Sequence, residues 1–144
     1  MGMVLMASHT IQSEAETADI ARAFACTLKK GDVVAFYGAL GAGKTTFIRG
    51  VIQSLTTPDA DVPSPTFTLL QTYDTPRFPI HHFDMYRLKN QAEAYELGIE
   101  DAFADGVSLI EWPERVASLL PRPHMRIDIE IKGSKRHIHI REVQ

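Results

Sequence analysis

Apolar and polar residues are patterned along the first part of the chain in the order helix, strand, helix. Residues 14–30 carry apolar side chains at helical spacing, and Ser13 with Glu16 has the form of a capping box that starts such a helix. Residues 32–37 are a short run of strand formers, which predicts a buried strand. Residues 44–55 again place apolar residues on one side and predict a second helix. This order is typical of α/β proteins.

The middle of the chain begins with a loop and continues with short elements. Three prolines between residues 56 and 65 leave little room for regular structure. Beyond them, apolar runs predict strands and amphipathic patterns predict helices. The predicted strands are residues 66–73, 80–85 and 107–112, and the predicted helices are residues 92–103 and 113–120, the latter opened by a proline.

The end of the chain has the clearest period-two pattern. Apolar residues at odd positions from 125 to 131 alternate with charged ones, Gly133-Ser134 is a turn signal, and the alternation resumes at Ile138 and Ile140. We therefore expect an antiparallel hairpin that extends the sheet of an α/β fold. Since no repeat, low-complexity stretch or boundary interrupts the 144 residues, we expect a single domain over residues 1–144.

A glycine-rich segment joins the first predicted strand to the second predicted helix. Residues 38–45, Gly-Ala-Leu-Gly-Ala-Gly-Lys-Thr, match the phosphate-loop pattern G-x-x-x-x-G-K-[ST] at every fixed position. The glycines allow a tight turn close to the phosphates, and the backbone amides form an anion nest. Lys44 is expected to reach the β- and γ-phosphates, and the Thr45 hydroxyl to bind Mg²⁺. The predicted nucleotide-binding residues are Leu40, Gly41, Ala42, Gly43, Lys44, Thr45 and Thr46.

Two acids end apolar runs that are predicted to be strands. Asp84 ends Ile-His-His-Phe-Asp, and Glu111 ends Leu-Ile-Glu. Because strand carboxyl ends in an open α/β sheet face the ligand crevice, both acids are expected beside the phosphate loop. Hydrolysis requires acids that hold Mg²⁺ and place water. Asp84, Glu111 and Lys44 are therefore the predicted catalytic residues.

Three neighbours of these acids are further candidates for the site. His81 and His82 adjoin in a predicted strand, so their side chains are expected on opposite faces and a shared metal site is not predicted. Trp112 follows Glu111 directly. For Trp112, a packing role and a contact with nucleotide or partner explain the sequence equally well.

Composition limits which binding partners and which cellular compartment are expected for this chain. The formal net charge is −3, so the chain as a whole is not attracted to nucleic acid, and an RNA link would need a local basic patch or a partner. The one cysteine, Cys26, suits a reducing compartment and is expected to be buried within the helix over 14–30. No signal peptide or membrane-length apolar run stands out, so we expect a cytoplasmic protein that does not associate with membranes.

Three segments follow the phosphate loop in a distinctive order. They are Ser64-Pro65-Thr66-Phe67, His82-Phe83-Asp84-Met85-Tyr86-Arg87 and Glu111-Trp112-Pro113-Glu114. Together with the loop they resemble the bacterial TsaE (YjeE) family over about residues 32–112. The resemblance implies a phosphate-loop NTPase core whose parallel central strands are flanked by antiparallel strands, with helices on both faces.

The resemblance also implies a function. TsaE-like proteins are small ATPases that bind ATP and Mg²⁺, hydrolyse ATP slowly alone, and are required for N6-threonylcarbamoyladenosine in tRNAs that read ANN codons. They dock on a heterodimer of TsaD and TsaB and reach tRNA only through that complex. ATP hydrolysis resets the complex between turnovers. By this resemblance we expect a Mg-dependent ATPase subunit of that machinery.

Site residues carry over from the family position by position. Lys44 and Thr45 match the phosphate and magnesium positions, and Thr66 lies in the switch-like segment Ser64-Pro65-Thr66-Phe67. Asp84 and Glu111 match the family's functional acids. The sequence leaves open which acid holds Mg²⁺ and which orients water. We favour Glu111, with Thr45, for the metal and Asp84 for the water.

Three other functions compete with this interpretation. A small-molecule or nucleotide kinase would use the same loop but usually needs an arginine-bearing lid; Arg49 and Arg87 are available, yet no Arg-rich lid segment stands out. A GTPase is disfavoured because the guanine-reading Asn-Lys-x-Asp is absent. A non-catalytic module would use ATP only as a docking signal. The preference for adenine rests on the resemblance alone.

Overall fold

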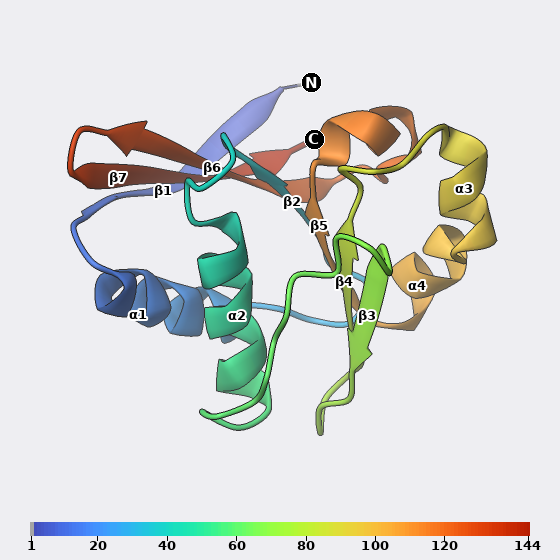
Figure 1. Cartoon of the computed structure of the whole chain (residues 1–144), viewed down its shortest axis with the longest axis horizontal. Helices are drawn as coiled ribbons and strands as arrows, with labels where there is room; N and C mark the ends of the chain where they lie inside the picture. Colours follow the sequence, from blue (N-terminus) through green and yellow to red (C-terminus); the bar gives the residue numbers. More distant parts are fainter. Residues whose placement is uncertain (1) are drawn as a thin grey trace.

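Seven strands form one mixed sheet within residues 2–144, the part of the chain that the computed structural model describes (Figure 1). Their order across the sheet is β1-β7-β6-β2-β5-β4-β3, and the four strands from β6 to β4 run parallel. The other three pair antiparallel with their neighbours. The bounds are β1 Met3–Ile11, β2 Val33–Tyr37, β3 Leu70–Tyr73, β4 Ile80–Asp84, β5 Val107–Glu111, β6 His124–Lys132 and β7 Lys135–Val143.

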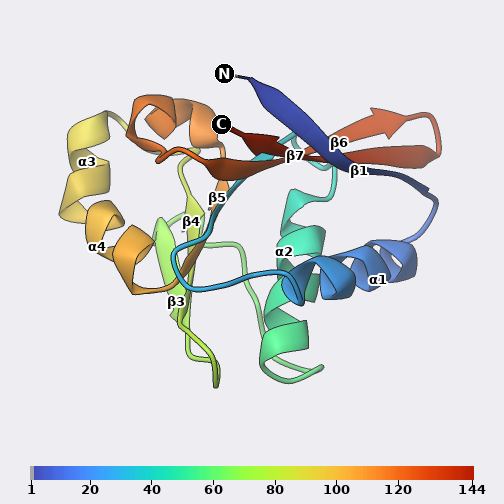
Figure 2. The ribbon, with the colours of Figure 1, turned by 180° about the vertical axis from the view of Figure 1, so that it is seen from behind.

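Helices cover both faces of the sheet, as Figures 1 and 2 show from opposite sides. Helices α1 and α2 lie on one face, and α3, α4 and the 3-10 helix η1 lie on the other. Successive residues of β2 point to opposite faces of the sheet. Val34 and Phe36 pack in the core beneath α1 and α2, and Val33 packs in the core on the other face. The bounds are α1 Glu14–Ala25, α2 Lys44–Leu55, α3 Gln91–Glu96, α4 Ile99–Asp105 and η1 Pro113–Leu119.

The predicted architecture is confirmed in its main features. Helix α2 begins and ends at the predicted residues, and β2, β4 and β5 agree with prediction to within a residue. The C-terminal hairpin turns at Gly133-Ser134, and its first strand pairs with β2. The segment over 113–120 is helical but of the 3-10 type.

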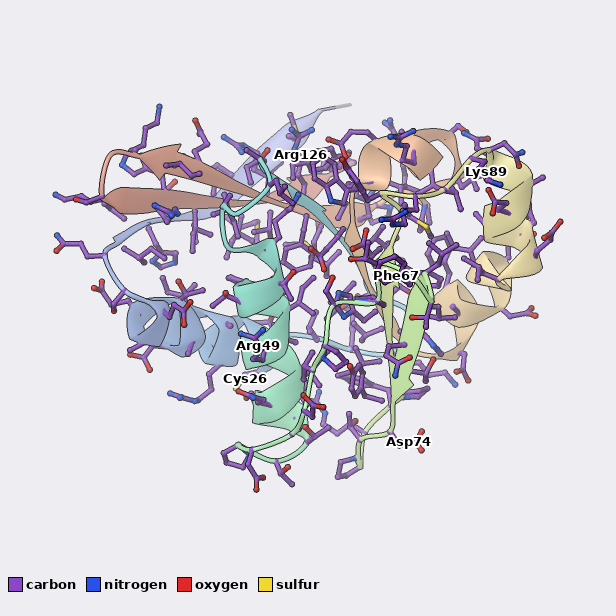
Figure 3. The ribbon with its side chains drawn as sticks, in the orientation of Figure 1. Cys26, Arg49, Phe67, Asp74, Lys89 and Arg126 are labelled. Atoms are coloured by element: carbon purple, nitrogen blue, oxygen red, sulfur yellow. The ribbon has the colours of Figure 1, made fainter. Side chains whose placement is uncertain are left out.

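The first helix is shorter than predicted, and the burial of Cys26 was wrongly predicted. Helix α1 ends at Ala25, where the amide of Thr27 and the amide of Leu28 switch to tighter turn hydrogen bonds. The Thr27 hydroxyl also donates to the carbonyl of Phe24 at 2.7 Å, which competes with helix continuation. Cys26 therefore lies just beyond the helix and is exposed (Figure 3).

Two other predicted elements are interrupted. The strand expected over 66–73 begins only at Leu70, because Leu69 has a positive φ of 68° and its amide closes a turn to the carbonyl of Pro65. The helix expected over 92–103 is split into α3 and α4 by Gly98, whose φ of +79° ends one helix and starts the next.

The N-terminal strand was not predicted from the sequence. Strand β1 pairs antiparallel with β7, so that Met3 lies opposite Val143, and the amide of Gln144 donates to the carbonyl of Gly2. The two chain ends consequently lie side by side (Figures 1 and 2). Within the described residues, no helix has the length and apolar character needed to cross a bilayer.

Candidate functional site

The phosphate loop has the backbone that its glycines predict. It connects β2 directly to α2, and Gly41 and Gly43 have φ angles of +81° and +110°. Side chains other than glycine rarely adopt these angles, so both glycines are required by the turn itself. Gly43 is also the residue that precedes the first turn of α2. The free amides at the start of this twelve-residue helix consequently face the loop, which favours an anion there.

Strand register brings the two predicted acids to the same edge of the sheet. In the parallel pair β4 and β5, Asp84 is the direct partner of Glu111. Both side chains are buried, each 3% exposed. A cavity of about 300 Å³ lies between them and the loop. It is lined by Leu40, Gly41, Gly43, Lys44, Thr45, Thr46, Ser64, Thr66, Asp84, Tyr86, Glu111 and Trp112.

Lys44 is held at the floor of this cavity by two contacts. Its ammonium donates to the carbonyl of Gly38 at 2.6 Å and lies 3.6 Å from the centre of the Trp112 ring. Burial lowers the pKa of Lys44, and the carboxylates of Glu111, Glu114 and Asp84 partly offset that effect. A phosphate entering the cavity would supply the strong counter-charge that these contacts lack.

Glu111 connects the phosphate loop to the sheet. Its Oε1 accepts a hydrogen bond from the Thr45 hydroxyl at 3.0 Å, and its Oε2 lies 2.8 Å from Nε2 of His82. Thr45 and Glu111 are the two residues expected to bind Mg²⁺, and the fold places their oxygens in direct contact. His82 is fully buried and was not predicted to take part in the site.

Asp84 is bound instead to the loop that precedes β3. Its Oδ2 accepts from the hydroxyls of Thr66 at 3.1 Å and Ser64 at 3.4 Å. Its Oδ1 accepts from the amide of Tyr86 at 3.0 Å. The two acids therefore have different environments: Glu111 faces the loop threonine, and Asp84 faces the switch-like segment. The separate roles favoured for the two acids stay a prediction.

The oxygen ligands available here suit Mg²⁺ bound together with a nucleotide. Within residues 2–144 there is no group of three or more His, Cys, Asp or Glu side chains able to hold a metal ion by themselves. Magnesium typically takes one or two carboxylates, with substrate phosphates and water completing its octahedron. Glu111 and the Thr45 hydroxyl fit that need, because the remaining positions are left to phosphate oxygens and water.

All predicted catalytic and nucleotide-binding residues except Ala42 line the cavity. Ala42 does not line it, since its side chain is packed in the core and 1% exposed. Trp112 lines the cavity and also packs against the second core, so its position is compatible with both of the roles left open for it. Ser64, Tyr86 and His82 were missed as individual site residues. All three lie within the segments that carried the family resemblance, which is the signal that could have indicated them.

The two adjacent histidines point to opposite faces, as predicted. His82 contacts Glu111, whereas His81 contacts the Thr72 hydroxyl at 3.1 Å and Asp105 at 3.0 Å, both outside the cavity. A larger cavity of about 820 Å³ lies between α1 and strands β1, β6 and β7. It is mainly apolar and contains none of the predicted catalytic or phosphate-binding residues.

Known proteins resemble this chain along almost its whole length. The crystal structure of YdiB from Bacillus subtilis matches it with a TM-score of 0.79 at 29% identity, covering 98% of this chain and 88% of that one. This match confirms the predicted α/β fold with parallel central strands. The tRNA threonylcarbamoyladenosine biosynthesis protein TsaE of Rickettsia bellii is 46% identical over 137 residues, which cover 94% of this chain and 95% of the relative.

Further similarity points to the same family. The protein of the same name from Bacillus subtilis is 39% identical over 126 residues, covering 87% of this chain and 77% of the relative. The family model described as "Threonylcarbamoyl adenosine biosynthesis protein TsaE" matches residues 11–139. The match includes the phosphate loop, both acids and the switch-like segment. The chain therefore belongs to the TsaE family.

Proposed function

We propose that this protein is a Mg-dependent ATPase subunit of the machinery that forms N6-threonylcarbamoyladenosine in tRNAs reading ANN codons. The observation that carries the proposal is the hydrogen bond between the Thr45 hydroxyl and Glu111 inside the phosphate-loop cavity. It joins the loop that binds polyphosphate to an acid at a strand end, which is the arrangement that phosphoryl transfer to water requires. The names of its relatives supply the tRNA modification.

Each side chain has a defined task in the proposed reaction. Loop amides bind the phosphates, and Lys44 leaves the carbonyl of Gly38 to contact the β- and γ-phosphates. Thr45 and Glu111 would hold Mg²⁺, which would supply charge neutralisation for the phosphate oxygens. Asp84 orients the attacking water. Water oxygen bonds to the γ-phosphorus, and the bond from that phosphorus to the bridging oxygen breaks. One water proton passes to a phosphate oxygen, and ADP and inorganic phosphate leave.

The proposed output of hydrolysis is a change in the surface offered to partner proteins. Asp84 is hydrogen-bonded to Thr66 and Ser64, so a change at the water position reaches the loop that precedes β3. Phe67, labelled in Figure 3, follows in that loop and is 82% exposed. Arg87 is stacked on its ring. We propose that this protein docks on TsaD and TsaB, that hydrolysis resets their complex, and that it contacts tRNA only through that complex.

A kinase function gains no support from the site. Neither Arg49 nor Arg87 lines the cavity, and Arg87 is engaged with Phe67. Arg49 lies on α2, away from the loop end of that helix (Figure 3). A kinase would also require room for an acceptor beside the γ-phosphate.

The proposed function is tested by reconstitution. This protein would be combined with TsaD, TsaB, ATP, Mg²⁺, threonylcarbamoyl-adenylate and tRNA, and modified nucleoside measured over several turnovers. We expect the modified nucleoside to keep forming beyond the first turnover only when this protein and hydrolysable ATP are both present. Equal yields with and without the protein would reject the tRNA-modification role. If no ATP hydrolysis is detected in the complete mixture, the ATPase role is rejected separately.

A further inference from the structure

His82 is a buried polar side chain to which the phosphate-loop mechanism assigns no task. It lies in β4, two residues before Asp84, and is 0% exposed. Its Nε2 lies 2.8 Å from Oε2 of Glu111, while its Nδ1 is buried with no hydrogen-bond partner among the described residues. Burying a histidine away from water costs folding free energy unless its hydrogen bond offsets that cost or serves a function.

The unpartnered nitrogen indicates where the ring proton resides. A proton on Nδ1 would be a buried donor without an acceptor, whereas a lone pair without a donor costs less. The proton is therefore assigned to Nε2, which donates to Oε2 of Glu111. Since that oxygen is occupied by the sheet, only Oε1 is directed at Thr45.

A glutamate side chain has three rotatable bonds, and its carboxylate can rotate unless a fixed donor holds one oxygen. His82 is such a donor, because it is held on β4, a strand paired on both sides, and is fully buried. The same arrangement is common at metal centres, where a partner behind a ligand orients it and its loss typically weakens metal affinity or activity about 10- to 100-fold.

We propose that His82 is the positioning residue for Glu111, holding its carboxylate by Oε2 so that Oε1 faces the Thr45 hydroxyl and the metal position. His82 itself does not touch nucleotide or metal in this scheme. This inference rests on the proposed function, since it concerns the metal-binding acid of that site. It adds a residue on β4 to a site otherwise built from the loop and the ends of β4 and β5.

His81 provides a matched control from the adjacent position. It is the same residue type on the same strand and is also buried, at 8% exposure. Its side chain faces the opposite side of the sheet and binds Thr72 and Asp105. Losing the hydrogen bonds of His81 should affect stability without affecting Glu111. The His81→Leu variant therefore separates the general effect of removing a buried histidine from the specific effect of losing the contact with Glu111.

The test compares nucleotide binding with and without metal in five proteins: wild type, His82→Gln, His82→Asn, His82→Leu and His81→Leu. Glutamine can place an N–H near the position of Nε2, whereas asparagine is too short and leucine has no donor. Affinity for a fluorescent ADP analogue would be measured in EDTA and across a Mg²⁺ titration. This readout depends on the metal position but requires no turnover, and melting temperature would be recorded for each variant.

We expect affinity in EDTA to be similar in all folded variants, because loop amides and Lys44 bind the phosphates. The Mg²⁺ concentration at half-saturation should rise about 10- to 100-fold in His82→Asn and His82→Leu, less in His82→Gln, and not in His81→Leu. Because glutamine and asparagine are both polar, their comparison still decides the matter if the leucine variant fails to fold.

Three results would overturn the inference, two of them in the polar variants of His82. One is an unchanged Mg²⁺ requirement in His82→Asn, and the other is an equal rise in His82→Gln and His82→Asn. A rise in His81→Leu matching that in His82→Leu would likewise assign the effect to folding. If wild-type protein shows no Mg²⁺-dependent nucleotide binding at all, the proposed function fails instead, which distinguishes the two.

Discussion

Replacing Glu111 separates its chemical role from its structural one. In Glu111→Ala, the Thr45 hydroxyl and the Nε2 of His82 both lose their acceptor. Thr45 lines the cavity, where water can replace the lost partner, but His82 is 0% exposed and keeps an unpaired donor. An unpaired buried donor costs about 1–3 kcal/mol. For a chain of this size, that corresponds to a fall in melting temperature of about 2–12 °C.

The variant Glu111→Gln should lose hydrolysis while keeping stability. Its amide oxygen can accept from His82, and its amide N–H can donate to the Thr45 hydroxyl oxygen. The volume is unchanged, so we expect the free energy of unfolding to stay within about 1 kcal/mol of wild type. The metal loses its charged ligand, and a loss of about 3 kcal/mol in transition-state stabilisation corresponds to a rate about 100-fold lower.

Phosphate release in the presence of Mg²⁺, thermal denaturation and binding of a fluorescent nucleotide would be measured side by side. Glu100→Gln serves as the control, since that acid is exposed on α4 and does not line the cavity. We expect both Glu111 variants to bind nucleotide in EDTA and neither to hydrolyse it at the wild-type rate. A Glu111→Gln protein with wild-type hydrolysis would refute the role of this acid, and a Glu111→Ala protein as stable as wild type would refute the structural cost.

Three further outcomes follow from other parts of the chain. Lys44→Ala should weaken ATP binding about tenfold or more, because a charge-assisted hydrogen bond is lost; an unchanged Kd for a fluorescent nucleotide would contradict this. ATP with Mg²⁺ should slow hydrogen exchange across residues 56–73, since Thr66 binds Asp84, and identical exchange in both states would reject it. Gly98→Ala should lower the free energy of unfolding by about 1–2 kcal/mol, because alanine is strained at the φ of +79° although its Cβ would meet open space. Hydrolysis should be unchanged, and an unchanged melting temperature would contradict the expected strain.

Features that depend on neighbouring residues could be predicted from the sequence. The loop over 38–45 and helix α2 follow from glycine positions and from helical spacing, both of which act within a few residues. Gly98 shows the limit of that approach, because one glycine inside a helical pattern does not reveal whether the helix continues. Its backbone angle depends on how α3 and α4 pack in the core that they share with Phe83 and Ile110, which local spacing does not contain.

Features that depend on distant partners could not be predicted in the same way. Strand β1 has no clear alternation at its start, and it becomes a strand by pairing with β7 about 130 residues later. Cys26 was misplaced because the end of α1 is decided by a hydroxyl–carbonyl bond of Thr27 rather than by periodicity. In each case a specific hydrogen-bond partner overrides the local pattern.

The register between β4 and β5 explains why the acids could be predicted and His82 could not. Ending an apolar run is a property of each strand alone, so Asp84 and Glu111 were found separately. His82 pairs with Leu109, two residues before Glu111, and therefore shares a face with it. A slip of one residue in this pairing would direct His82 and Glu111 to opposite faces. The buried partners that fix the register, among them Ile80 and Leu109, consequently shape the proposed magnesium site without touching it.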